Sequence, residues 1–557
     1  MNPKKQTAFI SWRFYLVLSM IALASFGLVC RVFDLAVLDQ PFLKRQGDDR
    51  VLRLVSTPAF RGMIVDRNNS PLAVSTTVYS LWMNPRELAP STSTWTTLGR
   101  LIDMKPAALL TLYKRNAKQK REFAYLKRGL SPEVAANLKA LNLPGLYLQR
   151  DYRRYYPEGE IAAQIIGMTN IDDQGQEGLE LAYDHVLAGE PGKKWVVKDR
   201  LGRVISDVEL VREQKRGLDL ILSIDKRIQY LAYRELLQGM TESEASSATA
   251  VVLDVETGEV LAMVNVPSFN PNKRPLTFGA HVRNRAVTDL FEPGSTMKAI
   301  SVASVLESGR YTPDTRVDTY PGWIRVGHNV VKDGKNNGVL TVRDIVKHSS
   351  NVGVTKMVLG LPPDHLWELL HRVGFGELTQ IGFPGEQSGS LVRHHTWGSF
   401  TLATLAFGYG VSVTTLQLAR AYAILANHGK KLPVSLLRVG AMPTGEAVIA
   451  PNVADQMLSM LESVISKDGT APAARITGYR VAGKTGTARM ALGGGYHEKR
   501  YISSFVGIAP VSHPRFVVAV VVNDPRGKQF YGGAVAAPIF AKIMEGALRL
   551  MDVAPDA

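Results

Sequence analysis

The chain has 557 residues, of which 45% are hydrophobic and 21% charged. This length leaves room for roughly two to four domains. The composition is ordinary for a folded globular protein, and it excludes a collagen-like chain, a disordered polymer and a multi-span membrane protein. The formal net charge is +16, and there is one cysteine, Cys30. An intrachain disulfide and a cysteine-based zinc site are therefore excluded.

An uncharged apolar run near the N-terminus predicts a membrane anchor. Residues 14–30 carry no charge, and with the apolar residues just beyond Arg31 they are long enough to span a bilayer. The charged residues before this run are all basic: Lys4, Lys5 and Arg13. This asymmetry predicts a cytoplasmic N-terminus and an exported remainder. A cleaved signal peptide is the alternative, with a possible cleavage site at residues 22–24. The apolar run continues to Val29, which favours an uncleaved anchor.

The region from about residue 51 to 215 has a mixed pattern. It opens with a short β-like run after a polar continuation of the anchor helix, and helical periodicity follows at 107–113 and 132–141. Much of the excess positive charge lies here, since twelve Lys and Arg stand against three acidic residues between Lys105 and Arg154. No nucleic-acid-binding motif accompanies them, so the densest part, 114–121, is interpreted as a solvated helix face. No catalytic cluster or internal repeat is found in this region.

A second, larger region begins near Gly217. It is predicted to begin with a strand at 218–224, a helix that Asp225 caps and that extends to about Met240, and a hairpin of strands 249–255 and 259–266. A long helical stretch follows at about 295–470 and includes an amphipathic helix at 415–427. The last predicted elements are strands at 480–490, 501–509 and 516–523 and a closing helix at 534–551. This order predicts an α+β fold, in which an antiparallel sheet has helices packed on both of its faces.

Three short motifs follow one another in this second region: Ser295-Thr296-Met297-Lys298 (Ser-x-x-Lys), Ser349-Ser350-Asn351 (Ser-x-Asn) and Lys484-Thr485-Gly486-Thr487 (Lys-Thr-Gly-Thr). The first two patterns are weak by themselves, because each has a second copy in the chain. The copy at Ser223–Lys226 is interpreted as a helix start with a surface lysine. The copy at Ser268–Asn270 is interpreted as a loop before Pro271.

The surroundings of Ser295 favour a nucleophile. A Pro-Gly turn precedes it, so it begins a helix, and Lys298 lies three residues on along the same helix face. A serine hydroxyl is a poor nucleophile without an adjacent base. A lysine can act as that base if burial and neighbouring cations lower its pKa. The free N–H groups of the helix start can also stabilise an oxyanion.

The Lys-Thr-Gly-Thr motif lies in a predicted strand, 481–490. A glycine weakens a strand unless something approaches its backbone closely, which suits a strand that pairs with an extended peptide substrate. Lys484 and Thr485 could then hold a carboxylate. His394 and His395 have no clustered partner and are interpreted as exposed loop histidines, so we expect no metal site and no cofactor. The pattern of a Ser-His-Asp hydrolase is also missing from the sequence.

The set of three motifs resembles that of penicillin-binding proteins and serine β-lactamases. Over nearly its whole length the chain is similar to class B penicillin-binding proteins, most of all to the division-specific, penicillin-binding protein 3 type. The segments that carry this resemblance are 291–298, 61–68, 154–157, 178–180, 222–225 and 531–533. It implies a peptidoglycan D,D-transpeptidase, a serine acyltransferase that cross-links stem peptides in septal cell-wall synthesis and that β-lactams acylate at Ser295.

The resemblance also implies roles for the motif residues. Lys298 would be the base for acylation, Ser349 would relay protons and Asn351 would hold the substrate amide. Substrate binding would fall to the last motif, Lys484, Thr485, Gly486 and Thr487, with the backbone N–H groups of Ser295 and Thr487 as the oxyanion hole.

The resemblance further implies an organisation along the chain and a set of partners. A cytoplasmic tail (1–13), an anchor (14–36), a non-catalytic pedestal (37–215) and a transpeptidase domain (216–557) would place the catalytic domain in the periplasm at the inner membrane. The expected partners are peptidoglycan stem peptides, β-lactams, a polytopic glycosyltransferase and other division proteins, with no nucleic acid. The bifunctional class A type is excluded because no glycosyltransferase region is found.

Three rival functions remain open at this point. A β-lactamase would need a base that activates water, and no Glu-x-x-Leu-Asn segment of the class A type is found. A β-lactam sensor would be expected to have several membrane spans and a cytoplasmic effector, whereas this sequence predicts one anchor and a short cytoplasmic tail. A D,D-carboxypeptidase differs only in its acyl acceptor, and the sequence does not exclude it.

Overall fold

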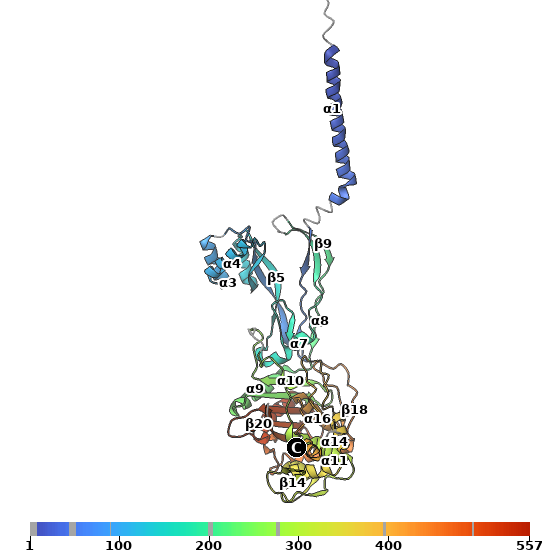
Figure 1. Ribbon diagram of the computed structural model, residues 1–557. Helices are drawn as coiled ribbons and strands as arrows, with labels where there is room; N and C mark the ends of the chain where they lie inside the picture. Colours follow the sequence, from blue (N-terminus) through green and yellow to red (C-terminus); the bar gives the residue numbers. More distant parts are fainter. Residues whose placement is uncertain are drawn as a thin grey trace, which may run out of the picture. The chain divides into compact units, whose positions relative to one another are not determined.

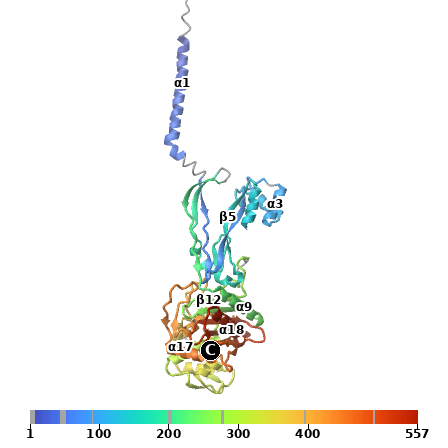
Figure 2. The same cartoon turned by 180° about the vertical axis from the view of Figure 1, so that it is seen from behind.

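The computed structural model describes residues 8–43, 52–89, 91–198, 204–273, 279–393, 397–492 and 495–557. The chain forms two compact units that are interleaved along the sequence (Figures 1 and 2). Unit 1 comprises Met1–Phe60, Thr77–Tyr152 and Gly189–Arg216, and unit 2 comprises Arg61–Thr76, Arg153–Ala188 and Gly217–Ala557. The start of the predicted cytoplasmic tail, residues 1–7, and the histidines His394 and His395 lie outside the described residues.

Unit 1 begins with the helix that the sequence predicts as an anchor. Helix α1 spans Ala8–Phe33 and continues as a π-helical turn, η1 (Asp34–Leu38). The stretch Trp12–Leu38 is long and apolar enough to cross a membrane, and none of it is buried against the rest of the protein. The predicted continuation of this helix to residue 50 is found only in part: η1 ends at Leu38, a bend follows at Asp39, and residues 40–43 form a short helical turn at the end of this described stretch.

The rest of unit 1 contains a three-stranded antiparallel sheet and a small helical cluster. The sheet has the order β1-β8-β9, with β1 at Leu52–Thr57, β8 at Gly192–Lys198 and β9 at Val204–Arg212. The cluster contains α3 (Thr92–Ile102), α4 (Pro106–Lys118), β4 (Ala124–Leu130) and α5 (Pro132–Ala140). Strand β3 (Pro71–Met83) ends in this unit, where it pairs with β4, and β5 spans Leu146–Tyr155.

Two predictions for this region are confirmed and one helix was missed. Helices α4 and α5 match the predicted periodicity, and the basic residues from Lys114 to Arg121 are mostly exposed, as a solvated face requires. Helix α3 was not predicted because its sequence is rich in Thr, which has a low helix propensity. Ser91 caps it by accepting from Thr94 N, and it buries an apolar face that includes Trp95 and Leu98.

Unit 2 includes a layer of short elements from three separate parts of the chain, Arg61–Thr76, Arg153–Ala188 and the start of Gly217–Ala557. They are β2 (Ile64–Val65), η2 (Gly159–Ile161), α6 (Ala163–Ile166), β6 (Met168–Thr169), β7 (Gly175–Glu177), α7 (Gly178–Ala182), α8 (Asp184–Leu187) and β10 (Leu220–Ile221). The predicted strand 218–224 is wrong in length, since only β10 is a strand. Its parallel partner β2 has two residues, so the ladder stops there.

A buried charge cluster holds this layer together. The carboxylate of Glu180 accepts from Arg61 Nε at 2.7 Å and from Arg154 Nε at 2.6 Å, and all three side chains are inaccessible to solvent. Arg61 also donates to the Asp184 carboxylate at 2.7 Å. Each buried charge therefore has an opposite partner, without which its desolvation would be costly.

The core of unit 2 is a five-stranded antiparallel sheet of the order β12-β11-β21-β20-β19. The strands are β11 (Ser247–Asp254), β12 (Val260–Val266), β19 (Ala482–Leu492), β20 (Gly495–Ala509) and β21 (Phe516–Asn523). Every residue of β11 and β12 is buried, so apolar residues point to both faces of these strands rather than alternating with exposed polar ones. All three predicted C-terminal strands and the predicted hairpin are confirmed.

Helices cover both faces of this sheet, as predicted (Figures 1 and 2). On one face lie α9 (Lys226–Glu242) and α18 (Gly532–Leu550), whose Phe540 packs 4.7 Å from Phe505 of β20. On the other lies α16 (Thr415–Ala426), which begins with a capping box between Thr414 and Gln417. Asp225 caps α9 by accepting from Arg227 N, which confirms the predicted helix start.

The predicted helical stretch at 295–470 is helical for the most part. Its helices are α10 (Arg285–Thr288) just before it, then η3 (Gly294–Met297), α11 (Lys298–Glu307), α12 (Val342–His348), α13 (Asn351–Leu359), α14 (Pro363–Val373), α15 (Ser399–Ala406) and α17 (Pro451–Ser463), with η5 (Pro472–Ala474) after it. Three small antiparallel ribbons interrupt it, namely β13 (Arg316–Asp318) with β16 (Val339–Thr341), β14 (Trp323–Val326) with β15 (Asn329–Lys332), and β17 (Lys430–Lys431) with β18 (Glu446–Ala447). The prediction missed these ribbons, although glycines at 322, 327, 334 and 338 punctuate the first two.

Candidate active site

Ser295 lies in a tightly held segment between the loop that precedes it and helix α11. Phe291 and Val413 exchange two backbone hydrogen bonds of 3.0 and 2.9 Å, and Gly294 N donates to Gly408 O at 3.1 Å. Gly294 has a φ of +57°, which a residue with a side chain rarely adopts. Ser295 is partly exposed, whereas its neighbours Gly294 and Thr296 are buried. The segment therefore presents one serine at the surface of a rigid turn.

Two hydrogen bonds hold the turn η3, which contains Ser295, in place. Thr296 Oγ1 donates to Pro293 O at 2.7 Å, and the buried Tyr422 of α16 donates through its hydroxyl to Thr296 O at 2.8 Å. The 3₁₀ turn then passes into α11, whose first residue is Lys298. The predicted helix start at Ser295 is confirmed in this form.

Lys298 is fully buried and makes three hydrogen bonds to the second motif. Its Nζ donates to Ser349 O at 2.5 Å, to Asn351 Oδ1 at 2.7 Å and to Ser349 Oγ at 3.2 Å. Burial, and next the charge of Lys484, lower the pKa of Lys298 well below its usual value, while Asp333 acts in the opposite direction. These are the conditions under which a lysine can act as a base.

The second motif stands at the junction of helices α12 and α13. Ser349 ends α12 in the left-handed conformation, with a φ of 58°, and this turn aims its hydroxyl at the two lysines. Asp333 secures the start of α13, because its carboxylate accepts from Ser350 Oγ and from Asn351 N, each at 2.5 Å. Asn351 Nδ2 donates to Lys332 O at 2.9 Å, so the Asn351 side chain is held at both ends.

Lys484 reaches Ser349 from strand β19. Its Nζ donates to Ser349 Oγ at 2.9 Å, and burial lowers the pKa of Lys484 to about 7. Thr485 Oγ1 donates to Thr470 Oγ1 at 3.3 Å. Thr487 is partly exposed, and its Oγ1 accepts from Gly532 N at 3.0 Å.

Strand β19 is the last strand of the central sheet, so one of its edges has no strand partner among the described residues. An extended peptide can add to such an edge. The structure explains the glycine at position 486 by packing within the protein rather than by the approach of a substrate. A Cβ there would lie 2.3 Å from Ser504 Oγ and 2.8 Å from Pro293 O, so the close approach comes from the protein itself. Gly486 thus lets β19 pack against the Ser295 segment.

The structure joins the three motifs into one hydrogen-bonded group, although they are widely separated in the sequence. Lys298, Ser349, Asn351 and Lys484 form it directly. In the described part of the chain, no hydrogen bond to the Ser295 hydroxyl is found. Ser223 has a structural role, since its buried Oγ donates to Val260 O at 2.8 Å. Ser268 lies in a loop and donates to Glu160 O. Both interpretations of these second copies are confirmed.

Sequence reasoning missed two groups around the site. The first is Asp333, whose only signal in the sequence is the Gly334 that follows it, since an Asp-Gly pair is typical of a turn. The other is a clasp around Glu292, whose Oε1 accepts from Gly410 N at 2.7 Å and from Tyr496 OH at 3.0 Å. The ring of Tyr409 packs edge-on against that of Tyr496, with centroids 5.5 Å apart. Glu292 thus ties the β19–β20 hairpin to the segment that carries Ser295.

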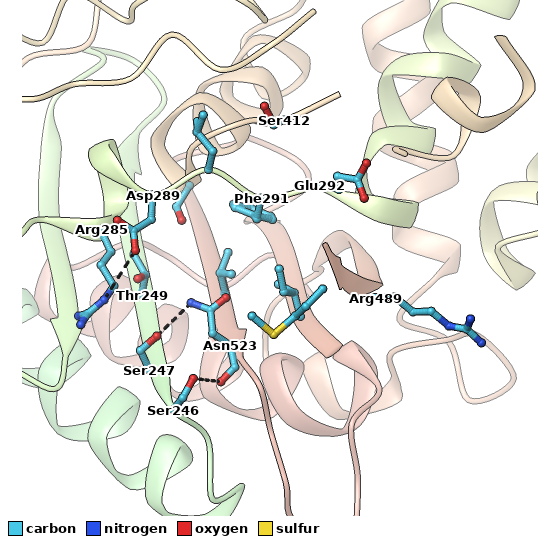
Figure 3. Close-up of a pocket in the computed structure, with 15 residues that line it drawn as sticks. Ser246, Ser247, Thr249, Arg285, Asp289, Phe291, Glu292, Ser412, Arg489 and Asn523 are labelled. Atoms are coloured by element: carbon cyan, nitrogen blue, oxygen red, sulfur yellow. Dashed lines mark hydrogen bonds and ion pairs between the residues drawn. The ribbon is translucent and has the colours of Figure 1, made fainter. Parts of the chain in front are cut away.

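A cavity of about 340 Å³ lies beside this site (Figure 3). It contains none of the eight motif residues that the sequence singled out. Its wall includes Phe291 and Glu292, which precede Ser295, and Arg489 and Met490, which follow Thr487. Hydrogen bonds between Ser246, Ser247 and Asn523 close one side.

Comparisons with known proteins agree over both regions. A family model described as the penicillin binding protein transpeptidase domain matches residues 248–545, and one for the penicillin-binding protein dimerisation domain matches residues 56–222. The peptidoglycan D,D-transpeptidase FtsI of Escherichia coli K12 is 42% identical over 564 residues, covering 100% of this chain and 95% of that protein. The probable peptidoglycan D,D-transpeptidase PbpC of Pseudomonas aeruginosa is 40% identical over 546 residues, covering 98% of this chain and 96% of that protein.

Solved structures are similar as well. The apo transpeptidase domain of Burkholderia pseudomallei penicillin-binding protein 3 is 40% identical, with a TM-score of 0.56, and covers 60% of this chain and 98% of that chain. Penicillin-binding protein 3 from Mycobacterium tuberculosis in complex with aztreonam is 28% identical, with a TM-score of 0.71, and covers 90% of this chain and 98% of that chain.

Proposed function

The chain belongs to the class B penicillin-binding proteins of the penicillin-binding protein 3 type, which are serine-type peptidoglycan D,D-transpeptidases, and we propose that Ser295 is the nucleophile of this activity. Catalysis then depends on the group formed by Lys298, Ser349, Asn351 and Lys484. The observation that carries the proposal is the convergence of two buried lysines on Ser349 Oγ, one of which, Lys298, begins the helix that follows the partly exposed Ser295 turn.

The first step is acylation. Neutral Lys298 takes the proton of the Ser295 hydroxyl as Oγ attacks the carbonyl carbon of the penultimate D-Ala. The backbone N–H groups of Ser295 and Thr487 stabilise the oxyanion that forms. The C–N bond then breaks, and the terminal D-Ala leaves after its nitrogen receives a proton. Ser349 is placed to deliver this proton, because its hydroxyl contacts both lysines.

The second step transfers the acyl group. The amine of a neighbouring stem peptide attacks the Ser295 ester, gives up a proton to the same lysine and serine group, and forms the cross-linking amide. Ser295 regains its proton and the cycle closes. One amide is exchanged for another, so the reaction needs no oxidant, metal or cofactor.

The last motif binds the donor peptide. Charged Lys484 and Thr485 hold the carboxylate of the terminal D-Ala, while the free edge of β19 pairs with the extended peptide. Gly486 keeps this strand against the Ser295 segment. A β-lactam presents a comparable carboxylate and a strained amide, and so acylates Ser295 in the same geometry.

The location and organisation of the protein follow the same proposal. Helix α1 anchors the chain in the inner membrane with the N-terminus in the cytoplasm, because the charged residues before the apolar run are basic. Residues 37–215 form a pedestal and residues 216–557 the periplasmic transpeptidase domain. The glycan strands come from a polytopic glycosyltransferase that acts with this protein and other division proteins at the septum.

Covalent labelling tests the nucleophile. The full-length protein in detergent is incubated with a fluorescent penicillin, alongside Ser295→Ala and Ser223→Ala, which removes the serine of the other Ser-x-x-Lys copy. Thermal unfolding verifies that each variant is folded. We expect persistent label on the wild type and Ser223→Ala and none on Ser295→Ala. Equal label on Ser295→Ala would refute the assignment, and label that clears within minutes would indicate a β-lactamase.

A further inference from the structure

The ribbon formed by β14 and β15 stands next to the second motif and has one uncovered face. It lies in unit 2, at the end farthest from α9 and α10 (Figure 1). Its register pairs Trp323 with Lys332 and Arg325 with Val330. Since side chains alternate between the faces of a strand, these four residues share one face. All four are exposed, with Trp323 at 47% and Val330 at 41%.

The opposite face of the ribbon is packed. Val326 and Val331 are buried against Ala403 of α15, and Ile324 packs against the same cluster. The position of the exposed face is therefore fixed by a small apolar core, as a docking surface requires.

The ribbon is also joined directly to the catalytic group. Lys332 O accepts from Asn351 Nδ2 at 2.9 Å, and the following residue, Asp333, holds Ser350 and Asn351 N. Lys484 contacts the same motif from β19 through Ser349. The ribbon and strand β19 thus contact different residues of the second motif. The donor peptide is proposed to bind at β19, not at the ribbon.

The exposed face is cationic. Arg325 and Lys332 lie on it and Lys335 follows it; all three are exposed, and no ion pair of theirs is found within the described ranges. The nearest acid in the sequence, Asp333, is occupied by its hydrogen bonds to the second motif. Trp323 adds a flat apolar ring between the charges. Such a surface is complementary to a chain that bears free carboxylates along with apolar groups.

We propose that this face, consisting of Trp323, Arg325, Val330 and Lys332 and called here the acceptor ribbon, docks the second peptidoglycan strand, whose amine attacks the Ser295 ester. Stem peptides carry free carboxylates for Arg325 and Lys332. Their alanine methyls and the apolar faces of the attached sugar rings suit Trp323 and Val330. This inference rests on the proposed function, because it assigns the acceptor of that reaction.

The two half-reactions separate this role from a donor or structural one. The test compares Trp323→Ala and the double variant Arg325→Ala/Lys332→Ala with wild type, using the full chain. The control is Lys114→Ala/Arg115→Ala, which removes two exposed cations from α4. Acylation by a fluorescent penicillin reports the donor half-reaction. Uncross-linked glycan strands whose stem peptides end in D-Ala-D-Ala serve as the second substrate. They report how much of the acyl-enzyme forms cross-links and how much is hydrolysed.

We expect penicillin acylation within about twofold of wild type in all variants, and a ratio of cross-linking to hydrolysis that falls about tenfold in the ribbon variants only. Added salt should lower the wild-type ratio and leave that of the double variant nearly unchanged. An unchanged ratio, or a parallel loss of penicillin acylation, would overturn the acceptor ribbon. Failure of the wild type to bind penicillin would instead remove the proposed function itself.

Discussion

Lys298 and Lys484 donate to one and the same atom, the hydroxyl oxygen of Ser349, over 3.2 and 2.9 Å. Both lysines are fully buried, and two ammonium groups this close cannot both remain charged at low cost. The charge of Lys484 is one of the reasons that the pKa of Lys298 is lowered. The pair therefore favours a neutral Lys298 that can act as a base and a charged Lys484 that can bind a carboxylate.

Removal of the Lys484 charge should shift the pH dependence of acylation. The Lys484→Met variant loses the Coulombic contribution that lowers the pKa of Lys298, so this pKa rises. Acylation needs neutral Lys298, so the acidic limb of the rate profile should move to higher pH. The measurement is the second-order rate constant for a β-lactam across the pH range. Lys467→Met removes an exposed lysine as the control. A limb that stays in place would contradict the coupling.

Gly408 should be far less tolerant of a side chain than Gly410 in the same loop. A Cβ at Gly408 would lie 2.1 Å from Gly294 O, whereas one at Gly410 has its nearest neighbour at 4.0 Å. Both glycines have positive φ, +85° and +78°, so the backbone strain is matched. We expect Gly408→Ala to slow penicillin acylation at least about tenfold, because it displaces the Ser295 segment, and Gly410→Ala to cost about 1 kcal/mol in stability with acylation largely kept. Equal acylation rates would contradict this prediction.

The clasp at Glu292 should control how firmly the β19–β20 hairpin is held. Glu292→Ala removes the acceptor for Gly410 N and Tyr496 OH, whereas Glu292→Gln keeps an oxygen in place. Faster amide hydrogen exchange in the hairpin, together with acylation slowed about tenfold, is expected for the alanine variant and not for the glutamine variant. Tyr496→Phe should have an intermediate effect. Glutamine and alanine variants that behave alike would show that the hydrogen bonds are not what matters.

The buried charge cluster predicts a large effect on stability. Glu180→Ala would leave Arg61 and Arg154 without their shared carboxylate in a site closed to solvent, and the loss should be about 3–5 kcal/mol. Glu545→Ala provides the control, because it breaks only the exposed pair with Arg549 and should cost less than about 0.5 kcal/mol. Chemical denaturation of the two variants measures the difference. Similar losses for both would contradict the role assigned to Glu180.

Local signals in the sequence were sufficient for much of the fold. The turn Glu256-Thr257-Gly258 identified the β11–β12 hairpin, and the amphipathic pattern over residues 415–427 identified α16. Helix α3 was not predicted because its stability comes from burying Trp95 and Leu98 rather than from the helix propensity of its Thr-rich sequence. The same limit applies to the site. The motifs could be found by pattern, but Asp333 and Glu292 act through contacts with residues distant in the chain, which no local pattern encodes.

The most direct test of the central claim follows both products of the reaction at once. Wild type and Ser295→Ala are given uncross-linked glycan strands whose stem peptides end in D-Ala-D-Ala, and released D-Ala and new cross-links are counted together. A Ser295 transpeptidase should yield the two in nearly equal amounts, and the alanine variant should yield neither. Release of D-Ala without cross-links would make the protein a D,D-carboxypeptidase, and cross-links formed by Ser295→Ala would place the nucleophile elsewhere.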